Sequence, residues 1–114
     1  MSLIFLAGAS RGVGREIAKR LVVGGYDVVA LLRNNRATEQ LMAMGITVVS
    51  GDAMDADMMM RIMGDFPVDC VISTIGGTPD GGGPRADFTG NKNLIDAAVL
   101  TQAKRFVMIS SIGS

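Results

Sequence analysis

The chain has 114 residues, of which 48% are hydrophobic, and its 11 basic and 11 acidic side chains give a formal net charge of zero. This length suffices for one domain with its own core, and the zero net charge gives no indication of nucleic acid as a partner. The sequence contains no histidine, which excludes Ser-His-Asp catalysis and histidine-ligated metal sites within the chain. No apolar run approaches the roughly 20 residues of a membrane span.

The single cysteine, Cys70, cannot form an internal disulfide and lies in an apolar run, which predicts a buried thiol in a reducing compartment. The amino-terminal LIFLAGA has no basic residues before it and leads into a charged segment, unlike a signal peptide. We therefore expect the protein in the cytoplasm, or inside an organelle after processing.

The hydrophobic pattern predicts five strands that alternate with helices. In chain order, the expected strands span residues 3–7, 26–32, 46–50, 68–74 and 105–110. The expected helices span residues 13–23, 37–44, 52–63 and 88–101, with a glycine- and proline-rich loop over 76–87. The third helix has Asp52 or Asp55 as its cap. Strands without a polar face indicate a parallel sheet with helices on both sides, a doubly wound α/β fold with strand order 3-2-1-4-5 and one domain over 1–114.

Three glycines, Gly8, Gly12 and Gly14, lie between the first strand and the first helix with the spacing GxxxGxG. Glycine lets the chain turn sharply there and lets backbone N–H groups approach a pyrophosphate, to which the helix N-terminus adds partial positive charge. The spacing alone is weak, but its place at the first strand–helix junction of a βαβ pattern favours a dinucleotide site. The alternative is a turn without a ligand.

The end of the second strand reads LLRNNR, where dinucleotide-binding sequences usually have a carboxylate for the adenosine ribose. Arg33 takes that place, and Arg11 lies within the glycine loop. An arginine suits a 2′-phosphate that a carboxylate would repel, so we expect NADP(H) to be preferred over NAD(H). The alternative is that Arg33 and Arg36 are solvated charges at a strand end.

Two further strand ends belong to the same predicted edge of the sheet. Asp52 follows the third strand and can accept a hydrogen bond from the adenine amino group, with Ala53 beside the ring; a plain N-cap explains Asp52 equally well. STIGG ends the fourth strand, where glycines would let the chain pass beside the ribose next to the nicotinamide. The Gly-Gly pair could equally be the start of the following loop.

Six stretches resemble, in order, the short-chain dehydrogenase/reductase superfamily, in particular its atypical, NmrA-like NAD(P)-binding branch: AGASRGVG, LLRN, VVSGDAMD, VISTIGG, GNKNLIDAA and RFVMISSIGS. The resemblance implies a Rossmann fold with six residues around the pyrophosphate: Gly8, Ser10, Arg11, Gly12, Val13 and Gly14. Arg33 would contact the 2′-phosphate, and Asp52 with Ala53 would contact the adenine. Ile75 and Gly76 would lie beside the ribose next to the nicotinamide.

The resemblance also exposes a departure. In catalytic members the serine after the fifth strand orients the substrate carbonyl, and that position corresponds here to Ser111. Active members add a tyrosine acid with a lysine four residues later, yet the only tyrosine is Tyr26 and no YxxxK is present. Family members continue beyond this point, so we expect the chain to be the amino-terminal, cofactor-binding part of a longer protein. The alternative is a shortened homologue that binds the nucleotide without that chemistry. A sheet that ends at its fifth strand leaves an apolar edge that predicts self-association.

Three functions are compatible with these features. The chain is the cofactor half of an NADP(H)-dependent reductase acting on an unknown small molecule, or a non-catalytic NADP(H) sensor or assembly factor that acts on a protein partner. A nucleotide-sugar epimerase, the third, needs the same absent tyrosine.

Overall fold

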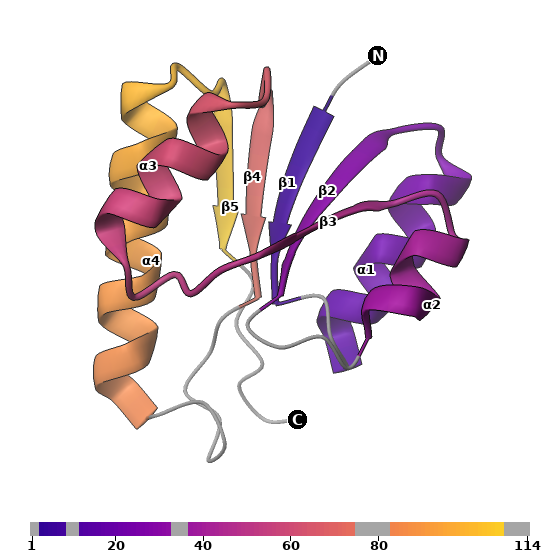
Figure 1. Ribbon diagram of the computed structural model, residues 1–114, viewed down its shortest axis with the longest axis horizontal. Coiled ribbons are helices and arrows are strands. Elements are labelled where there is room, and N and C mark those ends of the chain that lie inside the picture. The colour runs from indigo at the N-terminus through magenta and orange to yellow at the C-terminus, as the bar shows by residue number, and fades with distance from the viewer. Residues whose placement is uncertain (1–2, 9–11, 33–36, 75–82, 109–114) are drawn as a thin grey trace.

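The computed structural model describes residues 3–8, 12–32, 37–74 and 83–108 (Figure 1). Strands and helices alternate as β1 (Leu3–Ala7), α1 (Gly12–Val23), β2 (Asp27–Leu32), α2 (Thr38–Ala43), β3 (Thr47–Ser50), α3 (Ala56–Gly64), β4 (Cys70–Ser73), α4 (Gly83–Leu100) and β5 (Arg105–Met108). All neighbouring strands are parallel, and their order is β3-β2-β1-β4-β5. The predicted doubly wound fold and its strand order are confirmed.

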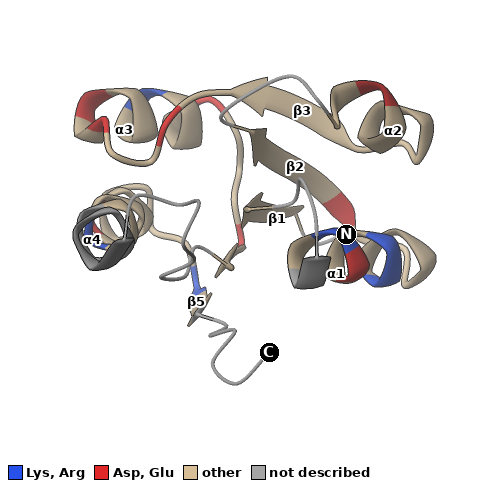
Figure 2. Ribbon diagram, turned by 90° about the horizontal axis from the view of Figure 1, so that it is seen from below, with Lys and Arg blue, Asp and Glu red and all other residues tan. Residues whose placement is uncertain are grey.

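Two hydrophobic clusters, one on each face of the sheet, form the core. Phe5 of β1 lies under α3 and α4 with Met59, Met63 and Leu94, all fully buried. The next residue, Leu6, points to the opposite face, where it packs with residues of α1 and α2. This alternation follows from the two-residue period of a strand, and Figure 2 shows the two helix pairs on opposite sides of the sheet.

Helix α4 begins at Gly83, within the stretch predicted to be a loop up to residue 87. The glycines and Pro84 suggested continuous irregular structure, but proline is tolerated in the first turn of a helix because the N–H groups there have no intrahelical acceptor. The helical pattern therefore starts five residues earlier than predicted.

The thiol of Cys70 is half-buried, not buried as predicted. Cys70 pairs with Arg105 in the sheet, and two residues later Ile72 pairs with Val107, whose side chain is 41% exposed. These four residues share one face of β4 and β5. In the described part of the chain, α1 and α2 cover that face over β1, β2 and β3 and do not extend over β5.

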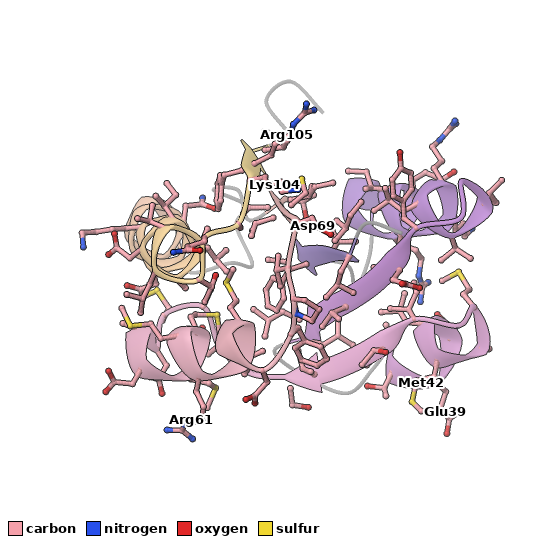
Figure 3. All side chains as sticks on the ribbon, turned by 90° about the horizontal axis from the view of Figure 1, so that it is seen from above. Glu39, Met42, Arg61, Asp69, Lys104 and Arg105 are labelled. Carbon is pink, nitrogen blue, oxygen red and sulfur yellow. The ribbon has the colours of Figure 1, made fainter. Side chains whose placement is uncertain are left out.

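At the amino-terminal edge of the sheet, Asp69 joins three strands (Figure 3). Its Oδ2 accepts a hydrogen bond from the amide of Leu3 at 2.9 Å, and its carbonyl oxygen accepts from the amides of Lys104 and Arg105 at 2.8 and 3.2 Å. These bonds fix the starts of β1, β4 and β5 relative to one another.

Candidate functional site

The carboxyl ends of the five parallel strands meet at one edge, the lower edge in Figure 1, which Figure 2 views directly. From β1 the chain continues to β2 and β3 on one side of the sheet, and later to β4 and β5 on the other. The boundary between β1 and β4 is therefore the topological switch point, where connections leave in opposite directions. In open α/β sheets this is where ligands bind.

Two glycines and a threonine make a tight crossing at the switch point. A Cβ on Gly8 would lie 2.2 Å from Oγ1 of Thr74, and a Cβ on Gly14 would lie 1.9 Å from the carbonyl oxygen of Gly8. Gly8 also has a φ of +91°, a conformation that strains other residues. Gly8 and Gly14 are thus glycines because the backbone of α1 packs directly against the ends of β1 and β4.

Thr74, the residue after β4, holds this crossing together. Its amide donates to the carbonyl of Ala7 at 3.0 Å, and its hydroxyl lies 3.0 Å from the carbonyl oxygens of both Ala7 and Gly8. The hydroxyl therefore stabilises the chain at the point where it leaves β1. Sequence analysis did not single out Thr74, although a polar residue at the end of an apolar strand is a usable signal.

The start of α1 has the electrostatics that a diphosphate needs. The helix begins at Gly12, has no acidic residue in its first turn, and carries the half-buried Arg15 just after it. Its first N–H groups have no intrahelical acceptor and bear partial positive charge. The packing of Gly14 against Gly8 brings this helix start to the end of β1, and the free N–H groups there fit a dinucleotide diphosphate.

The turn after β3 occupies the same edge of the sheet. The amide of Gly51 donates to the carbonyl of Leu32 at 3.0 Å, which holds the start of the turn against β2. Oδ1 of Asp52 accepts from the amide of Met54 at 2.9 Å, and this bond orients the half-buried carboxylate. The N-cap of α3 is Asp55, whose Oδ1 accepts from the amide of Met58 at 3.1 Å, so the plain N-cap interpretation of Asp52 is wrong.

Helix α4 supplies two buried asparagines to this edge. The hydroxyl of Ser73, the last residue of β4, donates to Oδ1 of Asn91. Nδ2 of Asn93 donates to the carbonyl of Ala53 at 2.8 Å. Sequence analysis missed both residues; the signal was the occurrence of two asparagines, which are poor helix formers, at apolar positions of a helix.

Six predicted site residues lie outside the described ranges and remain predictions: Ser10, Arg11, Arg33, Ile75, Gly76 and Ser111. Gly12 and Val13 form the first turn of α1, and the side chain of Val13 lies outside the described part. Tyr26 lies directly before β2, at the edge opposite the strand ends, and is 46% exposed. Within the described ranges no group of three or more Cys, Asp or Glu could hold a metal ion.

Comparison with known proteins decides the family. A family model described as NAD(P)H-binding matches residues 8–114. The chain belongs to this NAD(P)H-binding family. The match covers the glycine crossing and the carboxyl ends of β2 to β5, so binding of a dinucleotide cofactor follows, and the resemblance to short-chain reductases is confirmed.

The curated relatives of this NAD(P)H-binding chain include the photosystem II assembly factor Ycf39 of Cyanophora paradoxa. It is 30% identical over 111 residues, which are 97% of this chain and 35% of the relative. The match to Ycf39 of Cyanidium caldarium covers 36% of that relative. The chain therefore spans about a third of the length of these two relatives.

Two solved structures share the fold of the NAD(P)H-binding chain. ChuY, an anaerobilin reductase from Escherichia coli O157:H7, is 28% identical with a TM-score of 0.77, over 98% of this chain and 52% of the other. The Bordetella bronchiseptica enzyme WbmH in complex with NAD+ is 25% identical with a TM-score of 0.75, and the match covers 93% of this chain and 38% of WbmH. No helix in the described ranges is both long enough and apolar enough to span a membrane.

Proposed function

We propose that this chain is the NADP(H)-binding part of a short-chain dehydrogenase/reductase-like oxidoreductase. The bound nicotinamide would exchange a hydride with a small substrate that carries a carbonyl, alkene or imine. The residues of this chain would bind and orient the dinucleotide. The crossing of Gly8, Gly14 and Thr74 at the switch point carries the proposal, because it brings the backbone at the start of α1 directly against the ends of β1 and β4.

Preference for NADP(H) over NAD(H) rests on the sequence at the end of β2. Arg33 directly follows Leu32, the last residue of β2, at the edge where the adenosine would lie. A guanidinium there pairs with a 2′-phosphate, whereas the carboxylate usual in NAD-binding proteins would repel it. Arg11, within the glycine loop, adds positive charge to the same region of the sequence.

Titration with NADPH and NADH, followed by nicotinamide fluorescence, tests both the binding and the preference. We expect tighter binding of NADPH, and we expect Arg33→Asp to reverse the order. Arg61→Asp, a change on the exposed face of α3, is the matched control and should leave the order unchanged. Equal affinities for the two cofactors would contradict the role of Arg33, and no binding of either would contradict the proposed function.

The alternative is a non-catalytic NADP(H) sensor or assembly factor, which the relationship to a photosystem II assembly factor favours. The chain contains Ser111 as its single catalytic candidate and lacks a YxxxK pair. The coding sequence beyond Ser114 distinguishes the two. A continuation that contains YxxxK supports the reductase, and one without it supports the sensor.

The remaining proposals concern partners and location. Among the described strands β5 is an edge of the sheet, and the exposed Val107 lies on it, so we propose self-association along this edge. Sedimentation of the chain and of Val107→Lys would test it, since the charge should shift a dimer to monomer. The free thiol of Cys70 supports a reducing compartment, the cytoplasm or an organelle interior, which localisation of a tagged full-length protein would test.

A further inference from the structure

Asn93 is a polar residue in the hydrophobic interior. It is 8% exposed, and its neighbours on the inner side of α4, Leu94 and Ala97, are fully buried. Burying an amide in a helix is unfavourable unless the amide is hydrogen-bonded. Its partner is the carbonyl of Ala53, 2.8 Å away and 40 residues earlier in the chain. The bond therefore links α4 to the turn between β3 and α3.

This turn is held by hydrogen bonds at two points, one on β2 and one on α4. At its start, Gly51 donates to the carbonyl of Leu32 at the end of β2. At its third residue, Ala53 accepts from Asn93 of α4. Asp52 lies between these two anchors, and its carboxylate is oriented by the amide of Met54. Without the bond to Asn93, the turn would keep its hydrogen bond from Gly51 to β2, whereas Ala53 would keep only its packing in the core cluster and no hydrogen bond to α4.

We infer that Asn93 is a positioning residue for the adenosine half of the dinucleotide, an inference that rests on the proposed NADP(H) binding. Asn93 does not itself touch the ligand. It holds the backbone of Ala53, and through it the carboxylate of Asp52, at the place where both meet the adenine. The nicotinamide half lies at the end of β4, where Asn93 makes no contact.

The inference predicts a split between two halves of the ligand. ADP-ribose and nicotinamide mononucleotide serve as separate probes in calorimetric titrations. Asn93→Leu keeps the branched shape of the side chain but removes the donor to Ala53, and Asn93→Asp keeps the shape but replaces the donor with an oxygen. Loss of one hydrogen bond to a positioned group should weaken ADP-ribose binding about three- to tenfold, with nicotinamide mononucleotide unchanged.

A matched control separates positioning from stability. Ala97→Gly destabilises the same helix at a fully buried position, one turn from Asn93, and keeps the hydrogen bond between Asn93 and Ala53. It should lower the melting temperature and leave ADP-ribose affinity unchanged. In the ligand-free protein, hydrogen exchange of the Met54 amide, which is bonded to Asp52, should accelerate in Asn93→Leu and not in Ala97→Gly.

The outcomes are distinguishable. If the parent chain binds NADPH and ADP-ribose and the Asn93 variants bind ADP-ribose equally well, the inference is overturned and the proposed function stands. Equal losses for both probes, or the same loss in Ala97→Gly, would show a merely structural role and also overturn it. If the parent chain binds neither, the proposed function fails and the inference with it. Should Asn93→Leu not fold, Asn93→Asp and Asn93→Ser carry the test.

Discussion

Gly14→Ala perturbs the backbone crossing at the centre of the site. The added Cβ would lie 1.9 Å from the carbonyl oxygen of Gly8 and 2.9 Å from Oγ1 of Thr74, whereas real Cβ contacts do not fall below 3.0 Å. The obstacle is backbone, so no side chain can rotate away. The start of α1 must therefore move away from β1 by about 1 Å or more to restore an allowed contact.

The displacement has consequences for stability and for binding. Overpacking of this kind destabilises the fold by about 1–3 kcal/mol, and the higher helix propensity of alanine offsets up to about 1 kcal/mol of this loss. We expect a net loss of about 1–2 kcal/mol, seen as a fall in the melting temperature of roughly 5–10 °C. The N–H groups of the first turn move with the helix, and losing one bond to a charged diphosphate weakens NADPH binding about tenfold or more.

Gly64→Ala provides the control. Gly64 is the last residue of α3, and a Cβ there would meet nothing within 4 Å, so alanine should raise the stability slightly and leave NADPH affinity unchanged. Thermal unfolding and fluorescence titration, with binding measured well below the melting temperature, check both variants. If Gly14→Ala melts and binds NADPH as the parent chain does, the argument from the crossing is refuted.

Three more predictions concern the strand ends and the thiol. Thr74→Val keeps the branched shape but removes the hydroxyl from the carbonyl of Gly8, and we expect a loss of about 1 kcal/mol in chemical denaturation with several-fold weaker NADPH binding. Asp69→Ala removes the acceptor of the Leu3 amide at the opposite edge. It should lower the free energy of unfolding by about 1–2 kcal/mol and leave the NADPH affinity of the folded protein unchanged. Burial raises the pKa of the Cys70 thiol, assisted by Asp69 and opposed by the nearby guanidinium of Arg105. The rise of its alkylation rate with pH should therefore occur at higher pH in the folded protein than in the denatured chain.

Each of these has a contradicting result. Unchanged NADPH affinity in Thr74→Val would show that the hydroxyl does not contribute to cofactor binding. Weaker NADPH binding in Asp69→Ala would mean that the two edges of the sheet are coupled. For Cys70 the sign follows from the raised pKa: the unfolded thiol ionises first, so stability is lost as pH rises through the unfolded and then the folded pKa. If alkylation rises at lower pH in the folded protein than in the denatured chain, that conclusion is wrong.

The sequence by itself determined the order of the elements and the place of the site along the chain. Short apolar runs separated by helical patterns are local signals, and they predicted all five strands. Their order in the sheet followed from the right-handed crossovers of a doubly wound parallel sheet and is confirmed. The glycine spacing after β1 is equally local, because a turn without side chains must be encoded where it occurs. The start of α4 was predicted too late because local glycine and proline content outweighed the helix-compatible position of Pro84.

Only the tertiary structure decided which residues meet at that site. Thr74 contacts the carbonyl of Gly8 across 66 residues of sequence, and Asn93 contacts Ala53 across 40. No local pattern states the partner of a buried polar group, because the partner is selected by how the strands and α4 pack. The thiol of Cys70 shows the same limit: its apolar run indicated a strand, but its exposure depends on which helices cover that face of the sheet.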